Sequence, residues 1–335
     1  MQKRLSIRDI AARSGVSVST VSRVLNQNGY VAEETAQKVR AVIEEVNFMP
    51  SAAARELRGS STPMVGILVP DNIGEFFLDV MTALQKELQK KGYESVLVSS
   101  EGTENIRETY LYMQNRLNLV GWFHIMCEPF VEKIEIPTVI ICWQGSRKEK
   151  NLAYVTCNDL LGGYQAAEEL IRAGCRRIAC LGHARQNVVL PMPRAKDDNI
   201  RQRGAANAMR ANGLEVIPEL MMEAQGISYQ DGFDCAQQLL NVPDSFDGIF
   251  CMADRYVPGA VEAIYQRGLR IPEDIKVVGY GDNPISHVIC GGFTTVRIEL
   301  DELADAAIDS FLDMREGKIV EDKITGVSLI RRNTT

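Results

Sequence analysis

Two short amphipathic segments joined by a turn lie near the start of the chain, at residues 6–26 (SIRDIAARSGVSVSTVSRVLN). Ser6 begins a capping-box-like pattern, which is a helix N-terminal signal. Gly15 stands where a left-handed residue ends a helix, and Ser17 is placed to cap the next one. The second segment has apolar residues on one side and hydroxyl, amide and guanidinium groups on the other, without an acidic residue. Such a surface can approach a phosphate backbone closely, so we predict a helix-turn-helix with residues 18–26 as the recognition helix.

A third helix is predicted over residues 33–46, whose apolar stripe is wide enough to cover the first two helices. Pro50 then disfavours helical backbone at the residue before it. Between Ser51 and Gly59 only about two turns of helix fit, which is too short to be stable alone in water. Its alanines would let two copies pack together while Leu57 projects.

The order VSVSTVSRVLN, third helix and NFMPSAAARELRG is similar to the DNA-binding headpiece and hinge helix of the lactose repressor (LacI/GalR) family. The resemblance implies that major-groove bases are read by Val18, Ser19 and Arg23. It implies backbone or groove-edge contacts for Ser17, Thr20, Ser22, Asn26 and Tyr30. It also implies that DNA is contacted from the hinge helix by Ala54, Leu57 and Arg58, with Leu57 entering the minor groove and kinking the duplex. Arg23 is the expected guanine reader, because its planar fork matches O6 and N7.

The distribution of charge supports double-stranded DNA as the partner. The whole chain carries a formal net charge of −7, but the first 60 residues hold nine Lys and Arg against six Asp and Glu. Positive charge therefore gathers at the end that should meet phosphates. The chain opens without an apolar signal segment, and no stretch approaches the length of a membrane span. We expect a cytoplasmic protein with no membrane partner.

The eight cysteines are scattered singly, mostly inside apolar runs, and lack paired CxxC spacing. Reduced, buried thiols are the expected state. The three histidines do not cluster either, and no serine elbow, P-loop or nucleophile–base set is evident. We therefore predict no metal, no cofactor and no enzymatic activity.

After residue 63, apolar strand-like runs alternate with amphipathic helices. Strands are predicted at residues 64–69, 94–100, 120–126, 138–143, 176–182, 247–254 and 274–280. Helices are predicted at residues 73–91, 105–117, 164–173, 201–211, 230–240 and 257–267. This alternation predicts an α/β fold of parallel sheets covered on both faces. By resemblance, the core is periplasmic-binding-protein-like, with two Rossmann-like lobes.

The predicted domains are an all-α headpiece at 1–49, a hinge helix and linker at 50–63, and an effector-binding and dimerisation core at 64–335. The first lobe is expected at about 64–158 and 292–322, and the second at about 159–291 and 323–335. Residues 291–308 would cross back to the first lobe, and residues 327–332 would return to the second. The family resemblance also implies a homodimer, whose two-fold symmetry implies a palindromic operator.

A cleft between the lobes is the expected effector site, because ligands bind beyond the carboxyl ends of parallel strands. That rule points to residues 70–77, 142–145, 183 onward, 254–256 and 281–283. The resemblance implies a small-molecule effector, a sugar, sugar derivative or related metabolite. Arg201 stands at the arginine of the family's RxxG pattern, where a bidentate donor holds the effector. The effector-binding candidates are Phe76, Phe77, Trp143, Arg201, Asp254, Tyr256 and Asp282.

Three positions depart from the family pattern of sugar contacts. Ile227 replaces a stacking aromatic residue, Ala253 replaces an asparagine and Gly281 replaces an aspartate. A phosphorylated, acidic or less polar ligand is therefore compatible with the sequence, as is a protein co-regulator.

Three functions are thus weighed. The first is an effector-controlled repressor, in which the lobe angle decides whether two hinge helices form against each other and the minor groove. The second is a DNA-bound regulator that has no small-molecule effector and is controlled by a protein partner. The third is a solute-binding or enzymatic protein, which the missing export signal and catalytic set disfavour.

Overall fold

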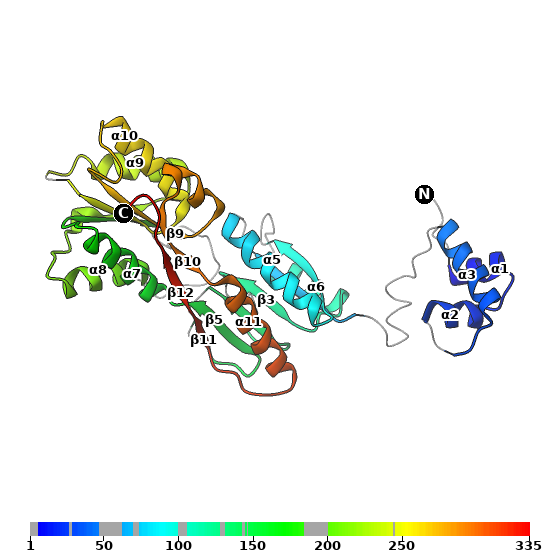
Figure 1. Cartoon of the computed structure of the whole chain (residues 1–335). Coiled ribbons are helices and arrows are strands. Elements are labelled where there is room, and N and C mark those ends of the chain that lie inside the picture. The colour runs from blue at the N-terminus through cyan, green and yellow to red at the C-terminus, as the bar shows by residue number, and fades with distance from the viewer. Residues whose placement is uncertain are drawn as a thin grey trace. The chain divides into compact units, whose positions relative to one another are not determined.

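The computed structural model describes residues 6–26, 29–46, 62–69, 74–99, 106–127, 131–142, 145, 147–183, 200–243 and 245–335. The predicted hinge helix, with Ala54, Leu57 and Arg58, lies outside the described residues, and so does Trp143. The chain divides into two compact units, Met1–Thr62 and Pro63–Thr335, which are taken in turn below (Figure 1).

The first unit contains the three predicted helices, α1 (Ile7–Ser14), α2 (Val18–Asn26) and α3 (Glu33–Glu45). Before α1, the Asp9 carboxylate accepts hydrogen bonds from the backbone N–H of Ser6 at 2.7 Å and from its hydroxyl at 2.6 Å. The left-handed backbone of Gly15 (φ 67°) then ends the helix. The sequence signals for both ends of α1 are confirmed.

A small apolar core holds these helices together. Ile10 of α1, Val21 of α2 and Val39 of α3 are completely buried and belong to one cluster. Each helix therefore contributes its apolar stripe to the centre, and the opposite side of α2 is left for solvent or a partner.

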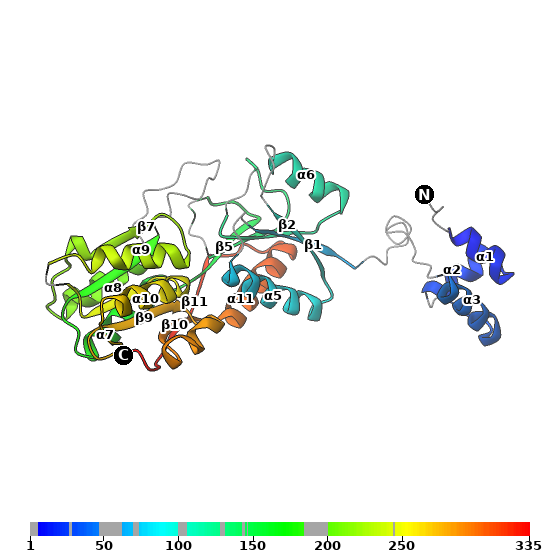
Figure 2. The same cartoon turned by 90° about the horizontal axis from the view of Figure 1, so that it is seen from above.

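The first lobe of the second unit is a parallel sheet with the strand order β11-β5-β4-β3-β1-β2. Its strands are β1 (Met64–Val69), β2 (Glu94–Ser99), β3 (Trp122–Ile125), β4 (Thr138–Ile141), β5 (Leu152–Cys157) and β11 (Lys323–Thr325). The helices α5 (Glu75–Lys90) and α11 (Leu300–Arg315) cover one face of the sheet, and α6 (Ile106–Arg116) covers the other (Figure 2).

The second lobe is a sheet with the order β12-β10-β9-β8-β6-β7, parallel except for β12. Its strands are β6 (Ile178–His183), β7 (Met221–Ala224), β8 (Gly248–Cys251), β9 (Lys276–Gly281), β10 (Thr294–Ile298) and β12 (Val327–Ile330). The helices α7 (Asp159–Arg172) and α8 (Ile200–Ala211) pack on one face, and α9 (Tyr229–Leu239) and α10 (Val257–Gln266) on the other. The described part of the lobe also contains four short 3-10 segments: η2 (Pro218–Leu220), η3 (Asp254–Tyr256), η4 (Pro284–His287) and η5 (Ile289–Gly291).

The predicted two-lobe α/β core is confirmed, but four strands were not predicted. These are β5, β7, β10 and β11, of which β7 has four residues and β11 has three. Segments this short carry little periodicity of their own and become strands because a neighbouring strand pairs with them.

The expected lobe boundaries also need correction. Residues 292–322 were assigned to the first lobe, yet β10 pairs with β9 inside the second sheet. Residues 323–335 were assigned to the second lobe, yet β11 pairs with β5 inside the first. The chain therefore crosses between the lobes near Asn158, Glu299 and Gly326, and not near residues 292 and 323. The return of the chain to the second sheet through β12 is as predicted.

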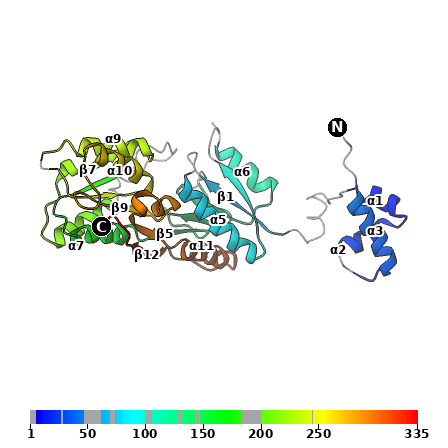
Figure 3. The ribbon, with the colours of Figure 1, turned by 45° about the horizontal axis from the view of Figure 1, so that its top comes forward.

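Figure 3 shows β5, β12 and α11 close to one another where the chain passes between the lobes. Hydrogen bonds link the three crossings. The backbone N–H of Asn158 donates to the carbonyl of Thr325 at 3.0 Å. The hydroxyl of Ser328 donates to the Glu299 carboxylate at 2.6 Å. The crossings thus form one hinge on which the lobes can turn. Among the described residues, no helix combines the length and apolar composition needed to span a membrane.

The packing of α7 on α8 depends on two glycines. A Cβ added to Gly163 would lie 1.9 Å from the backbone oxygen of Arg201, and one added to Gly204 would lie 2.1 Å from that of Leu160. The helix backbones therefore touch, which brings the first turn of α8 against the start of α7.

We expect Gly204→Ala to lower the free energy of unfolding of the core by about 1–3 kcal/mol, because the extra methyl group forces two packed backbones apart. Urea titration followed by circular dichroism would measure the change. Asn207→Ala, on the exposed side of the same helix, is the matched control and should be neutral or slightly stabilising. Equal midpoints for the two variants would contradict this account of the crossing.

Candidate nucleic-acid interface and ligand pocket

The solvent-facing side of α2 carries the residues predicted to meet DNA. Val18 keeps 42% of its surface exposed, and Ser19 and Arg23 are exposed beside it. The hydroxyl of Ser17 accepts a hydrogen bond from the backbone N–H of Thr20 at 3.1 Å, so it caps the helix as predicted. Hydrogen bonds of 2.7 and 2.9 Å also link the Ser17 hydroxyl with those of Ser19 and Thr20. A row of hydroxyls therefore marks the N-terminal end of α2, where backbone N–H groups also favour phosphate.

Arg23 lies at the edge of the same surface. The stem of its side chain runs beside Gly29, since a Cβ there would be 3.6 Å from Arg23 Cδ. Tyr30 follows with 90% of its surface exposed. Ser22 is half-buried on α2, and the side chain of Asn26 lies outside the described part of the chain. The DNA-reading roles of these residues stay predictions, as do those of Ala54, Leu57 and Arg58.

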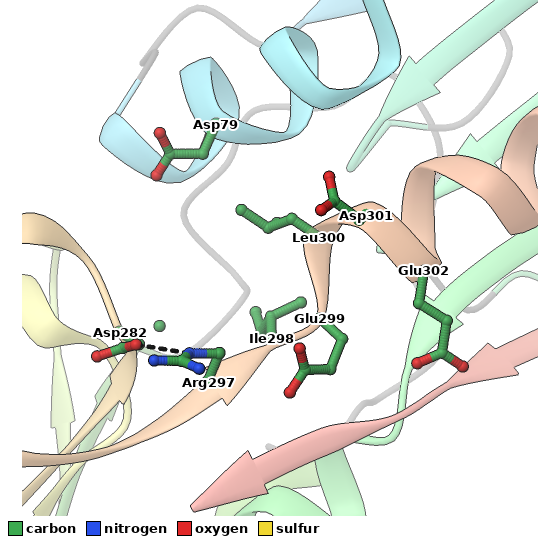
Figure 4. A pocket seen from close by; sticks show the side chains of 9 residues that line it. Asp79, Asp282, Arg297, Ile298, Glu299, Leu300, Asp301 and Glu302 are labelled. Carbon is green, nitrogen blue, oxygen red and sulfur yellow. Dashed lines mark hydrogen bonds and ion pairs between the residues drawn. The ribbon is translucent and has the colours of Figure 1, made fainter. Parts of the chain in front are cut away.

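The second unit has a pocket of about 620 Å³ where α5 faces the end of β9 and the crossing from β10 to α11 (Figure 4). The described residues that line it are Asp79, Gly281, Asp282, Arg297, Ile298, Glu299, Leu300, Asp301 and Glu302. Both lobes and a hinge crossing contribute, as expected of an inter-lobe site, and the volume is in the range of small-molecule pockets.

Asp282 is the predicted effector-binding residue that lines this pocket. It has a left-handed backbone (φ 54°) directly after Gly281. Its carboxylate accepts hydrogen bonds at 2.7 Å from Arg297 and from Arg332, and at 2.9 Å from the Ser286 hydroxyl. Burial would raise the pKa of Asp282, but the bonds from Arg332 and Arg297 hold the pKa below its usual value. Asp282 is thus a fixed anion between two cations.

Arg201 was predicted to bind an effector through two nitrogens of its guanidinium group. In the structure, this group has partners within the protein. Its Nε donates to the Asp159 carboxylate at 2.8 Å, and its Nη1 donates to the carbonyl of Met252 at 2.7 Å. The guanidinium also stacks on Tyr280, 3.7 Å from the ring centroid. Burial would lower the pKa of Arg201, but the charge and hydrogen bond of Asp159, together with Tyr280 and Cys157, outweigh burial and raise the pKa well above its usual value. Two of the three guanidinium nitrogens therefore bond within the second lobe, and the effector-binding role of Arg201 stays a prediction.

Asp254 and Tyr256 also have internal partners and are not among the described residues that line the pocket, so their assignment to the effector site stays a prediction. Asp254 is completely buried and accepts hydrogen bonds from the Thr295 hydroxyl at 2.7 Å and from the backbone N–H of Asn283 at 2.8 Å. Burial raises the pKa of Asp254 to about 6. The ring of Tyr256 lies in the core, and its hydroxyl donates to the carbonyl of Gly226 at 2.8 Å.

Phe76 and Phe77 form an edge-to-face pair with ring centroids 5.7 Å apart on α5. Both pack against the core shared by the lobes and are not among the described pocket-lining residues. Asp79 and Arg297 do line the pocket but were not predicted. Arg297 ends up there because β10 also delivers its carboxyl end to the cleft, and that strand was not recognised from the sequence.

The described residues contain no group of three or more His, Cys, Asp or Glu side chains arranged to hold a metal ion. All eight cysteines are free thiols, and seven of them are buried. Burial raises the pKa of Cys180 to about 12, so this thiol stays protonated and behaves as a small apolar side chain.

Comparison with protein families matches two parts of the chain. Residues 6–51 match the profile of the bacterial regulatory proteins, lacI family, and residues 167–335 match that of the periplasmic binding protein-like domain. The first match contains α1, α2 and α3, and the second contains most of the second lobe and α11.

Two relatives match over nearly the whole chain. The ribose operon repressor of Escherichia coli is 32% identical over 314 residues, which cover 91% of each protein. The HTH-type transcriptional repressor PurR of Escherichia coli is 31% identical over 317 residues, which cover 92% of this chain and 89% of the relative.

Solved structures share the fold. A lac repressor dimer bound to operator and the anti-inducer ONPF matches with a TM-score of 0.79 and 22% identity, covering 99% of both chains. A LacI family transcriptional regulator from Enterococcus faecium with bound ribose matches with a TM-score of 0.67 and 21% identity, covering 81% of this chain and 98% of the other.

Replacing Arg201 tests whether it acts inside the protein. We expect Arg201→Leu to lower the free energy of unfolding without any ligand by about 3 kcal/mol, because Asp159 would keep a buried charge without its cation. The double variant Arg201→Leu/Asp159→Asn should recover part of the loss. Denaturant titration would measure both, and wild-type stability of Arg201→Leu would favour a ligand-binding role instead.

A second prediction concerns Asp254 and pH. Its pKa is near 6 when folded and near its usual value of 3.8 when unfolded, so the folded state binds more protons between these values. The contribution of Asp254 to stability should therefore fall by up to about 3 kcal/mol from pH 4 to pH 6 and stay constant above. The stability difference between wild type and Asp254→Asn, measured against pH, should show this slope. A flat difference would contradict the raised pKa.

Proposed function

The chain belongs to the lacI family of bacterial regulatory proteins, and we propose that it is a transcriptional repressor that binds a palindromic operator as a homodimer, under the control of a small-molecule effector. The observation that carries the proposal is the outward side of α2, which presents Val18, Ser19 and Arg23 away from a fully packed three-helix core. Two relatives that match over about nine-tenths of the chain are transcriptional repressors.

In this proposal α2 enters the major groove. The hydroxyls at its N-terminal end contact backbone phosphates and set the register, which carries no sequence information by itself. Arg23 reads a guanine through O6 and N7, and Val18 packs against a thymine methyl group or leaves space for one. Absence of acidic residues from α2 keeps the surface compatible with the polyanion.

The hinge segment lies outside the described residues, so its role rests on the sequence. Two copies of residues 51–58 would form helices only when a dimer and the minor groove hold them together. Leu57 would then open a base step, at a cost of a few kcal/mol that added protein–DNA contact offsets. This makes the segment the bistable element through which an effector weakens or strengthens DNA binding.

Exposed apolar side chains indicate where the two copies meet. Leu78 on α5 and Leu97 on the edge strand β2 are exposed in the first lobe. Tyr265 on α10 and Val288 beside η4 are exposed in the second lobe. Apolar side chains that gather on a surface favour contact with a partner, and we propose that both sets belong to the dimer interface.

The pocket between α5 and the end of β9 is the effector site in this proposal. A ligand that contacts both lobes prefers one lobe angle, which is the differential affinity that regulation requires. A carbohydrate-related metabolite is the class that the relatives suggest, since one is a ribose operon repressor. A regulator of this kind acts in the bacterial cytoplasm, and we assign it no catalytic step.

A second candidate is a DNA-bound regulator controlled by a protein partner without a small molecule. Ile227, Ala253 and Gly281 favour it, because none of them supplies the polar or aromatic sugar contact usual at its position in the family. Binding of any small molecule to the pocket, with a matching change in operator affinity, would exclude this candidate.

The proposal predicts the effect of changing Arg23. Arg23→Ala should weaken operator binding by about 1–3 kcal/mol and relax base preference at one position in each half-site. The operator would first be found by selection from random duplexes and by footprinting upstream of the coding region, and then titrated with all four bases at each position.

Arg40→Ala, on the exposed side of α3, is the control and should keep the base preference. An equal loss of affinity for all four bases would remove Arg23 from base reading. Failure of the wild-type protein to bind any duplex at low salt would overturn the proposed function itself.

A further inference from the structure

The polar side chains among the described lining residues of the ligand pocket are all charged. Among the described lining residues, Asp79, Asp282, Arg297, Glu299, Asp301 and Glu302 carry charge, while Gly281, Ile298 and Leu300 are apolar or bare backbone. The described lining includes no amide, hydroxyl or aromatic side chain. Charged side chains can also hydrogen-bond a neutral sugar, so the class of ligand that this lining favours depends on how the charges are distributed around the space.

One side of the pocket has a net positive charge. Arg297 and Arg332 both bond to the Asp282 carboxylate at 2.7 Å, so two cations share one anion. Arg297 uses only its Nε for this bond, and its side chain is 43% exposed. Its two Nη groups form no hydrogen bond with a described residue, and the fork is held in place for a carboxylate.

The other side of the pocket is negatively charged. Some of its carboxylates already accept hydrogen bonds within the protein, and others do not. Glu299 accepts a hydrogen bond from Ser328 at 2.6 Å, and Glu302 accepts one from the backbone N–H of Gly326 at 3.2 Å, so both are used by the hinge. Asp79 has no ion pair or hydrogen bond with a described residue. Burial, together with the nearby charge of Glu75, raises the pKa of Asp79 above its usual value.

Asp79 would therefore be stabilised by a cation that the described lining does not supply. Figure 4 shows Asp79 on α5 at one side of the pocket, with Arg297 and Asp282 at the other and Asp301 at the start of α11. The charges are separated across the space, so a ligand with opposite charges at its two ends would satisfy both sides.

We propose that the effector is a small zwitterion whose carboxylate is bound by Arg297, held in place by Asp282 and Arg332, and whose ammonium group is bound by Asp79 with Asp301 nearby. This inference rests on the proposed function and narrows the class of its effector. The skeleton between the two charges, which can be a carbohydrate, occupies the rest of the pocket.

Ligands with charge of one sign fit the pocket less well. A phosphate ester would meet Arg297 but would place two negative charges among the carboxylates of Asp79, Asp301 and Glu299. A polyamine would meet those carboxylates but would face the net positive charge of Arg297 and Arg332. Only a molecule with both charges gains on both sides.

The test measures ligand binding to the full-length dimer by thermal shift and calorimetry. The probes are the twenty protein amino acids and D-glucosaminate, which is a zwitterion on a sugar-acid skeleton. Four comparison ligands lack one or both charges of a zwitterion. D-glucosamine carries only an ammonium group, D-gluconate carries only a carboxylate, and D-ribose is neutral. Inorganic phosphate is an anion without an organic skeleton. At least one zwitterion should bind at least about tenfold more tightly than each comparison ligand.

Two variants separate the two contacts. Asp79→Asn should bring the affinity for the best zwitterion down to that for the matching acid without the amine. Arg297→Gln should bring it down to that for the matching amine without the carboxylate. Asp309→Asn and Arg210→Gln, which change exposed charges outside the pocket lining, should leave all preferences unchanged.

The outcomes distinguish this inference from the proposed function. Tightest binding of D-ribose, D-gluconate or phosphate, or no binding of any probe, overturns the zwitterion. Unchanged preferences in Asp79→Asn or Arg297→Gln overturn it as well. Each of these results leaves specific operator binding by the same preparation intact, whereas failure to bind DNA overturns the proposed function whatever the ligand affinities are.

Discussion

The buried carboxylate of Asp159 organises the end of the second lobe that faces the pocket. A charge at the start of α7 without a cation would be costly in that interior, and Arg201 supplies the cation at 2.8 Å. The close crossing of α7 and α8 at Gly163 and Gly204 makes this short distance reachable. Tyr280 adds both a hydrogen bond to Asp159 and a ring face for Arg201. Arg201 thereby stabilises the packing of this end of the second lobe. The described cation that lines the pocket is Arg297.

The pocket lies next to the hinge, so ligand binding can change the angle between the lobes. Arg297 and Glu299 sit at the crossing from β10 to α11, and Asp79 comes from a helix of the first lobe. A ligand held at both ends therefore binds one lobe angle more tightly than another, and the difference in binding free energy is the regulatory signal. In the proposed mechanism a short hinge helix receives that signal, because a helix of two turns is unstable alone and forms only when added contacts stabilise it. By linkage, operator DNA then changes the effector affinity by the same factor.

Local sequence signals predicted the headpiece well. The capping pattern at Ser6, the left-handed Gly15 and the Ser17 cap are short-range features, and each depends on residues within one helical turn. Most strands of the core were equally predictable, because long apolar runs between amphipathic helices leave few alternatives. The strands β5, β7, β10 and β11 were missed, since a short or mixed segment becomes a strand only through pairing. Because these strands were missed, the expected lobe boundaries were also wrong.

The sequence by itself determined the family, the helix-turn-helix with its outward residues, and the class of the core, because these follow from local patterns of polarity and backbone preference. Only the tertiary structure decided which charged residues face the ligand. Arg201, Asp254 and Tyr256 each have an internal partner that the sequence did not indicate, while Asp79 and Arg297 line the pocket from different lobes. Pairing of charges depends on distances of a few ångströms between residues far apart in the chain, and no local pattern specifies those distances.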